Sequence, residues 1–158
     1  MLLGYQRAAD AFTSTAAERA VEPLAWWQKR ICDPDGMSQA FGAFHEGLLI
    51  GGVTVEYSVK TKTKHKAHVI GMYVLGEHRH LGAGHALLHA VINHAKLRTG
   101  VKMLVLTLTE GNLQAKRLYE SAGFEQFGLE PIAIFTGTKY KSKVHMLLML
   151  PVRTQNAA

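Results

Sequence analysis

The stretch that most constrains the fold is "GMYVLGEHRHLGAGHALLHAVINHAKL", residues 71–97, in which a strand pattern passes through a glycine-rich turn into a helix pattern. We predict the strand over "KAHVIGMYVL" and the helix over residues 82–98. Apolar residues recur there at helical spacing, namely Leu87, Leu88, Val91, Ile92 and Ala95. Gly82 and Gly84 stand at the helix start and let another group approach the backbone. Because free N–H groups at a helix start bind anions, the unit predicts a phosphate site, with a tight turn as the alternative.

Helix and strand signals alternate on both sides of this unit. The predicted order is a helix over residues 13–36, two strands over 38–59, the strand–turn–helix unit, a buried strand over 101–109, a helix over 112–123, and strands over 124–130 and 143–152. Thr15 and Glu18 are predicted to form a capping box, Pro23 to lie in a first helical turn, and Asn112 to be an N-cap. This order predicts an α/β fold, a mixed sheet flanked by helices in a single domain of residues 1–158.

Composition and charge narrow the function classes. The chain has 158 residues, 47% of them hydrophobic, and a net charge of +6. It shows no signal-peptide pattern and no apolar run of the ~20 residues that a membrane helix needs, and its single cysteine is Cys32. We therefore expect a cytoplasmic protein with no membrane partner. The positive charge favours an anionic partner such as a nucleotide cofactor. Because no aromatic residue interleaves the lysines of residues 60–66, we expect a solvated loop there and no nucleic-acid partner.

Histidines offer a second explanation for the strand–turn–helix unit. Five of the nine histidines lie within residues 77–97, and His85 and His89 have the i, i+4 spacing of zinc ligands. Only Glu77 and no cysteine accompany them locally. We therefore expect these histidines to be structural or solvent-exposed, and we expect no metal site.

Two motifs with the buried strand between them carry the most specific information. The first is [QR]-x-x-G-x-[GA] at a strand-to-helix turn, matched by Arg79, Gly82 and Gly84. The second is N-x-x-A-x-x-L-Y-x-x-x-G-F, matched at every position by Asn112, Ala115, Leu118, Tyr119, Gly123 and Phe124. Together they resemble the GNAT superfamily of N-acetyltransferases over about residues 38–151. The resemblance implies a mixed, mostly antiparallel sheet flanked by helices, and transfer of the acetyl group of acetyl-CoA to an amine.

The resemblance also implies a role for each matching residue. The backbone of Met72, Tyr73 and Val74 would bind the pantetheine arm of acetyl-CoA as an added strand does. The pyrophosphate would lie against Arg79, His80, Leu81, Gly82, Ala83, Gly84 and His85. Asn112 would contact the pantetheine or the reacting centre, and Tyr119 would protonate the leaving thiolate. The expected partner is a small-molecule or peptide amine, and the alternative function is a non-catalytic acyl-CoA-binding sensor on the same scaffold.

Two positions depart from the family pattern. His80 stands where family members usually carry glycine, which either narrows the approach to the phosphates or adds a donor to them. His68 stands where histone-acetylating members carry a glutamate base. Strand alternation predicts that His68 shares a face with Met72 and Val74 unless a bulge intervenes, and its imidazole can then accept the amine's proton through water. Glu56, Glu110 and water are the alternative bases.

The N-terminal segment is short for this family. Family members begin with a strand and a first helix before the segment matching "AFTSTAAERAVEPLAWW", whereas only residues 1–11 precede it here. We predict that the first strand is missing and that "LLGYQRAADAF" is a remnant of the first helix. The sheet would then have an exposed edge, which can support a homodimer.

Overall fold

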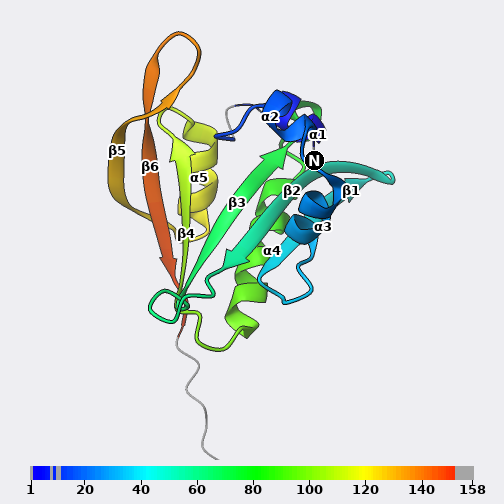
Figure 1. Cartoon of the computed structure of the whole chain (residues 1–158). Helices are drawn as coiled ribbons and strands as arrows, with labels where there is room; N and C mark the ends of the chain where they lie inside the picture. Colours follow the sequence, from blue (N-terminus) through cyan, green and yellow to red (C-terminus); the bar gives the residue numbers. More distant parts are fainter. Residues whose placement is uncertain (1, 8, 10–11, 152–158) are drawn as a thin grey trace, which may run out of the picture.

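The structure, a computed structural model, describes residues 2–7, 9 and 12–151, and its centre is a six-stranded sheet of order β1-β2-β3-β4-β6-β5 (Figure 1). The strands are β1 (Ser38–His45), β2 (Leu48–Tyr57), β3 (Lys66–Val74), β4 (Met103–Thr109), β5 (Glu125–Phe135) and β6 (Tyr140–Met149). The helices are α1 (Leu2–Arg7), α2 (Ala16–Ala20), α3 (Leu24–Ile31), α4 (Ala83–Leu97) and α5 (Leu113–Ser121), with a short 3₁₀ turn η2 (Gly76–His78). β3 and β4 pair in parallel and the other neighbours antiparallel, so the predicted mixed, mostly antiparallel sheet is confirmed.

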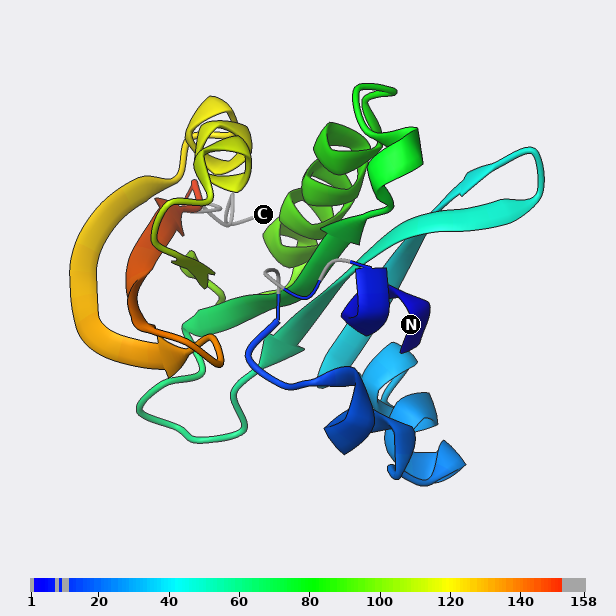
Figure 2. The ribbon, with the colours of Figure 1, turned by 90° about the horizontal axis from the view of Figure 1, so that it is seen from above.

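Helices cover both faces of the sheet. Figure 2 shows α4 and α5 on one side and α1, α2 and α3 on the other. The apolar stripe of α4 is buried as predicted, through Leu87, Leu88, Val91, Ile92 and Ala95. This stripe joins residues such as Val53 and Val55 of β2 in the main core, which is the burial that stabilises the helix against the sheet.

The parallel pair at the centre of the sheet is short. β3 and β4 pair only from Lys66 opposite Met103 to His68 opposite Val105. Beyond His68 the two strands diverge, and Figure 1 shows the gap between them widening toward their carboxyl ends. The backbone groups of β3 that face β4 beyond that point therefore have no strand to pair with, and they remain available to a ligand.

A bulge in β3 moves the side chains that follow it to the other face of the sheet. Gly71 adopts a φ of 62°, a conformation that favours glycine. The pairing with β2 shifts at this point, because Gly52 lies opposite Tyr73 while Thr54 lies opposite Ile70. Two steps along β2 thus correspond to three steps along β3.

The bulge makes the prediction that His68 shares a face with Met72 and Val74 wrong. Met72 and Val74 pack against the main core under α4, whereas Tyr73 packs in the smaller cluster on the opposite face, with α1. His68 lies on the same side as Ile70 and Tyr73 and is exposed. Strand alternation gave the wrong face because one extra residue reverses the alternation.

The N-terminal segment is helical where the structure describes it. Residues 2–7 form α1, as predicted, and no strand precedes β1 among the described residues, so β1 forms one edge of the sheet. Ala8, Asp10 and Ala11 of the predicted helix remnant lie outside the described residues, as does Val152 at the end of the predicted last strand.

The helix predicted over residues 13–36 is two helices, α2 and α3. The capping box is confirmed, since the backbone N–H of Glu18 donates to Thr15 Oγ1 and that of Thr15 donates to the Glu18 carboxylate. Pro23 is the N-cap residue of α3 and does not lie within its first turn. Proline has no N–H to continue α2, so the chain breaks and restarts there.

Candidate active site

A cavity of about 880 Å³ lies between the end of β3, the glycine turn and α5. Its lining includes Met72, Tyr73, Val74, Arg79, His80, Gly82, Ala83, Gly84, His85, Asn112 and Tyr119, so the structure brings almost all predicted site residues together. Leu81 is the exception among the predicted cofactor residues, because its side chain is 58% exposed and does not line the cavity. His68 is the exception among the predicted catalytic residues.

Several residues of this lining were not predicted. They are Gly76, His78, Gln114, Ala115, Arg117, Leu118 and Ser121. Four of them, Gln114, Arg117, Leu118 and Ser121, are spaced three or four residues apart along α5, so they share one side of that helix. The signal that identifies them is the helical period counted from Leu118 of the second motif, since Gln114 lies four residues before it and Ser121 three residues after it.

The start of α4 presents open backbone donors to the cavity. Gly82 is its N-cap with a φ of 77°, and no side chain caps the first turn. The first N–H groups of a helix have no partner within the helix, and here they belong to residues 83–85, which line the cavity. His80, just before this turn, has a φ of 69°, a left-handed conformation that costs a non-glycine residue ~1–2 kcal/mol. This is the physical reason why glycine suits that position.

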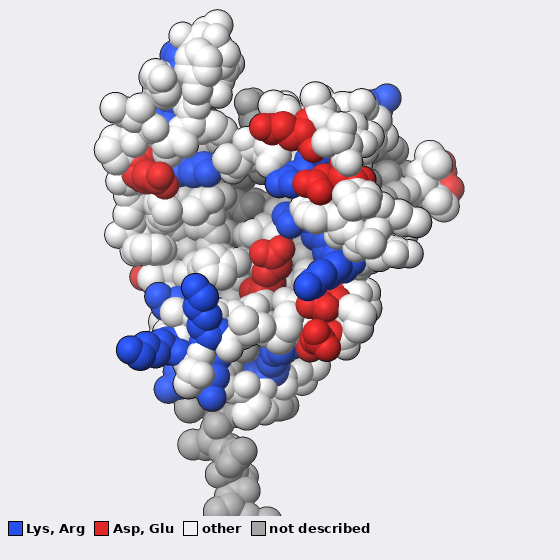
Figure 3. All heavy atoms as spheres, viewed as in Figure 1, with Lys and Arg blue, Asp and Glu red and all other residues white. Residues whose placement is uncertain are grey.

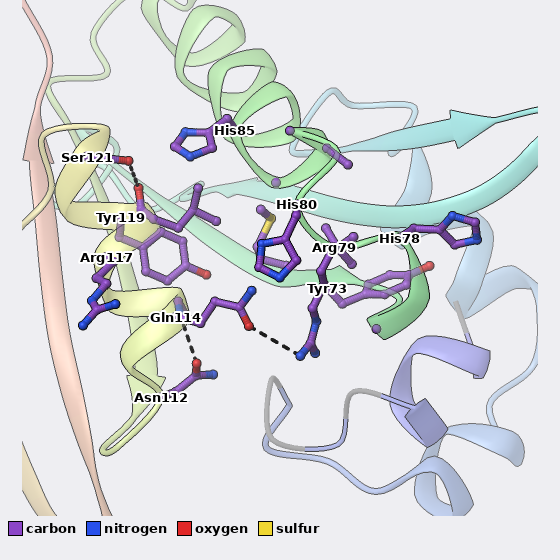
Figure 4. Close-up of a pocket in the computed structure, with 18 residues that line it drawn as sticks. Tyr73, His78, Arg79, His80, His85, Asn112, Gln114, Arg117, Tyr119 and Ser121 are labelled. Atoms are coloured by element: carbon purple, nitrogen blue, oxygen red, sulfur yellow. Dashed lines mark hydrogen bonds between the residues drawn. The ribbon is translucent and has the colours of Figure 1, made fainter.

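Positive charge surrounds these donors. Arg79 donates to Gln114 Oε1 at 3.4 Å and so links the glycine turn to α5, as Figure 4 shows. Arg117 lines the cavity from α5, and no acidic residue lines it among the part of the chain that the structure describes. This wall of the cavity therefore suits an extended anionic ligand, because the wall offers both backbone amides and positive charges.

Tyr119 lies at the inner end of the cavity. Its side chain is buried beside Phe124, and burial raises the pKa of its phenol to about 12. Figure 4 shows the hydroxyl pointing into the cavity. Asn112, one residue before α5, uses its side-chain oxygen to accept from the N–H of Ala115 at 3.1 Å, so its predicted N-cap role is confirmed.

A second cavity, of about 200 Å³, lies on the opposite side of the sheet, under α1, α2 and α3. It shares four lining residues with the first cavity, Met72, Asn112, Ala115 and Tyr119. The two cavities therefore meet beside Tyr119, in the gap between β3 and β4. Two ligands that enter from opposite sides of the sheet can come into contact at this point.

The three candidate bases lie outside both cavities. His68 is exposed and lies opposite Glu56 across β2 and β3. Glu56 accepts from Arg30 Nη1 at 3.2 Å, and Arg30 lines the second cavity. Ile70 lies two residues beyond His68 on the same face of β3 and also lines that cavity. His68 therefore lies on the side of the sheet where the second cavity is found. Glu110 lines a neighbouring hollow beyond the end of β4.

Two other possibilities raised by the sequence concern metals and membranes. No group of three or more His, Cys, Asp or Glu side chains in the described part of the chain is arranged to hold a metal ion. No helix within the described ranges is long and apolar enough to cross a membrane. Lys60, Lys62 and Lys64 lie in the loop between β2 and β3 and Lys66 begins β3, at the end of the sheet away from the cavities, as the lower part of Figure 3 shows.

Comparison with known proteins gives consistent results. The sequence model of the acetyltransferase (GNAT) family matches residues 4–124. A ribosomal-protein-alanine N-acetyltransferase from Brucella melitensis is 23% identical with a TM-score of 0.76, and the match covers 94% of this chain and 92% of that one. The ribosomal-protein-S18-alanine N-acetyltransferase from Escherichia coli is 20% identical with a TM-score of 0.71, covering 98% and 90%. A putative acetyltransferase from Salmonella typhimurium, solved with its cofactor acetyl-CoA, is 21% identical with a TM-score of 0.71, covering 93% and 80%. These likenesses show a shared fold, and no curated protein matches the sequence.

Proposed function

The chain belongs to the GNAT family of acetyltransferases, and from the two cavities that meet at Tyr119 we propose that it transfers the acetyl group of acetyl-CoA to a primary amine. The larger cavity takes acetyl-CoA and the smaller one takes the amine. The acceptor is a small molecule or a peptide. The Brucella and Escherichia neighbours are named for protein acceptors, and these names support an amine acceptor in general.

The residues of the larger cavity fit acetyl-CoA. The open amides of residues 83–85 and the guanidinium groups of Arg79 and Arg117 suit a pyrophosphate, and the Salmonella neighbour contains this cofactor. When bound, acetyl-CoA supplies an acetyl thioester, which an amine can attack.

The backbone of β3 supplies donors to the gap. The N–H of Leu75 donates to Ile50 O at 2.8 Å, so the pair formed by Val74 and Gly51 is a non-hydrogen-bonded pair. The N–H of Val74 consequently points away from β2, toward the diverging β4. There this N–H group can bind the pantetheine arm or polarise the carbonyl of the thioester. Neither interaction requires the backbone to rearrange, because the strand already holds the N–H group in this direction.

His80 gives the first prediction. Its ring points into the larger cavity in Figure 4 despite the strained backbone, which supports the interpretation that it adds a donor to the phosphates. We expect His80→Gly to change the free energy of unfolding by no more than ~1 kcal/mol, because released strain offsets the flexibility that glycine adds. The affinity for CoA, measured by calorimetry, should fall ~3- to 10-fold with the lost donor.

A control separates this effect from a general loss of histidine near the turn. His89, one turn beyond His85 along α4, is exposed and lines neither cavity. His89→Ala should bind CoA as the parent does. If His80→Gly binds CoA more tightly than the parent, His80 narrows the approach to the phosphates and donates nothing to them.

His68 gives the second prediction. Two residues along a strand span ~7 Å, so a proton leaving an amine beside Ile70 can reach His68 through water. We expect His68→Gln to lower kcat/KM by ~10², at the low end of general-base effects. His65→Gln, in the loop three residues earlier, is the matched control. An unchanged kcat/KM would direct attention to Glu56, Glu110 or water.

Turnover tests the proposal as a whole. The protein is incubated with acetyl-CoA and a panel of amines, and two products are measured: free CoA thiol, and acceptors that gain an acetyl group by mass spectrometry. Acetylation of any amine supports the transferase. Tight binding of acetyl-CoA with no acetylated amine would favour the acyl-CoA-binding sensor.

A further inference from the structure

We propose that the smaller cavity recognises a carboxylate on the acceptor, so that the acceptor is a small amino acid and not a neutral amine or a peptide N-terminus. This inference rests on the proposed acetyl transfer, and it adds the class of acceptor. It is carried by the charges and the size of the smaller cavity.

Three cationic side chains line the smaller cavity from three elements. Arg19 comes from α2, Arg30 from α3 and Lys143 from β6, and no acidic residue lines the cavity among the described residues. Figure 3 shows basic side chains on both sides of the hollow between the β5–β6 hairpin and the N-terminal helices. An anion in this hollow is therefore approached by positive charge from two sides.

The ring of Trp26 holds the two arginines of this wall in place. Both guanidinium groups lie over that ring, at 4.7 Å for Arg19 and 5.1 Å for Arg30. A contact of this kind limits the motion of the two guanidinium groups beside the cavity.

The remaining bonds of these cations leave their charge only partly compensated. Arg19 donates to Glu22 at 3.1 Å and to Ser14 Oγ at 2.7 Å, and Arg30 donates to Glu56 at 3.2 Å, so each arginine has one carboxylate partner. Lys143 donates to Thr13 Oγ1 at 3.0 Å. Within the described ranges, no carboxylate lies within ion-pair distance of Lys143. A hydroxyl does not neutralise an ammonium group, so an anion beside Lys143 gains a full opposite charge.

The size of the cavity suits a small acceptor. A volume of about 200 Å³ equals that of roughly seven liquid waters, which suits the amine, α-carbon and carboxylate of an amino acid. The amine must reach Tyr119, where the cavities meet, while the cations line the rest of the wall. An amine one or two carbons from its carboxylate spans this arrangement.

The test pairs each L-amino acid with its carboxamide, which keeps the amine and removes the charge. With acetyl-CoA, we expect kcat/KM to be ~10- to 100-fold higher for the acids, mainly through KM, as for the loss of one charged hydrogen bond. The carboxamide also resembles a peptide N-terminus, in which an uncharged amide follows the free amine. Equal or faster acetylation of the amides would overturn the inference while leaving the transferase intact.

Variants separate recognition from a structural role for the same cations. Lys143→Met should lower kcat/KM for the acids ~10-fold or more and leave that for the amides unchanged, whereas Lys139→Met, in the β5–β6 turn outside the cavity, should change neither. If Lys143 only holds Thr13 in place, Lys143→Met will lower the melting temperature and affect acids and amides equally. That outcome would contradict the inference.

A binding measurement keeps the inference testable without turnover. Calorimetry in the presence of CoA compares N-acetylated amino acids, which are the expected products, with their carboxamides. We expect the acids to bind ~10- to 100-fold more tightly and Lys143→Met to abolish the difference. Equal affinities would overturn the carboxylate site, and a failure of acetyl transfer alone would count only against the proposed function.

Discussion

A Tyr119→Phe variant is expected to fold normally, to bind acetyl-CoA as the parent does, and to lose a factor of ~10²–10⁴ in kcat. The substitution keeps the ring and its contact with Phe124 and deletes only the hydroxyl that points into the larger cavity. Packing and cofactor affinity therefore survive, and only a step that needs the phenolic proton is slowed. Stopped-flow or steady-state release of CoA thiol, together with calorimetry, separates the two quantities.

The environment of Tyr119 explains why its phenol suits an acid and not a base. Burial raises its pKa to about 12, so the group stays protonated at every pH at which the protein works. A thiolate leaving into the same apolar surroundings is destabilised as well, which raises its affinity for the phenolic proton. With the phenol removed, the thiolate must leave unprotonated or take its proton from water.

Tyr57 provides a matched control. It is also a buried phenol, burial raises its pKa to about 12, and its hydroxyl has no partner among the described residues. It lines neither cavity. Tyr57→Phe should therefore leave kcat unchanged and raise the free energy of unfolding by ~1 kcal/mol, because an unsatisfied buried group is removed. If Tyr119→Phe retains near-normal kcat, water or another residue protonates the thiolate and Tyr119 is a packing residue.

Gly84→Val is expected to abolish measurable CoA binding while the protein remains folded. Gly84 lies in the first turn of α4 and lines the larger cavity, so a branched side chain occupies space that a phosphate needs to reach the amides. The structure adds a second consequence. A Cβ at this position would lie 3.2 Å from Leu118 Cδ2, so the variant also presses on α5. Calorimetry with CoA and circular dichroism measure the two effects.

A double variant distinguishes blocked phosphate approach from displacement of α5. Leu118→Ala removes the methyl groups that a new Cβ would meet. The double variant Gly84→Val with Leu118→Ala therefore relieves the steric contact with α5, but the valine still blocks the approach of a phosphate to the amides. We expect no recovery of CoA binding in the double variant. Gly128→Val, in β5, is the control for adding valine, since its Cβ would make only an ordinary contact at 3.7 Å. Unchanged CoA affinity in folded Gly84→Val would remove the main support for this cofactor site.

Local patterns identified the parts of this protein that depend on neighbours in the sequence. The helical spacing of Leu87 to Ala95 predicted α4, and the glycines before it predicted a turn with open amides, both as found. Asn112 as the N-cap of α5 was also correct, because capping involves residues at most four positions apart. The two motifs placed Tyr119 and the glycine turn together through the resemblance to a family whose membership is now shown.

Other features depend on contacts between distant segments, and only the tertiary structure decided them. The bulge at Gly71 reversed the expected face of His68, because a register shift depends on how β2 pairs with β3 and leaves no periodic signal in β3 itself. The divergence of β3 from β4, which joins the two cavities, is likewise a property of the pair. The cationic wall of the smaller cavity unites Arg19 and Arg30 with Lys143, which lies more than a hundred positions further along the chain, and no local pattern brings such side chains together. Sequence periodicity reports on the nearest helical turn or strand step, whereas a ligand site depends on which elements the completed core holds side by side.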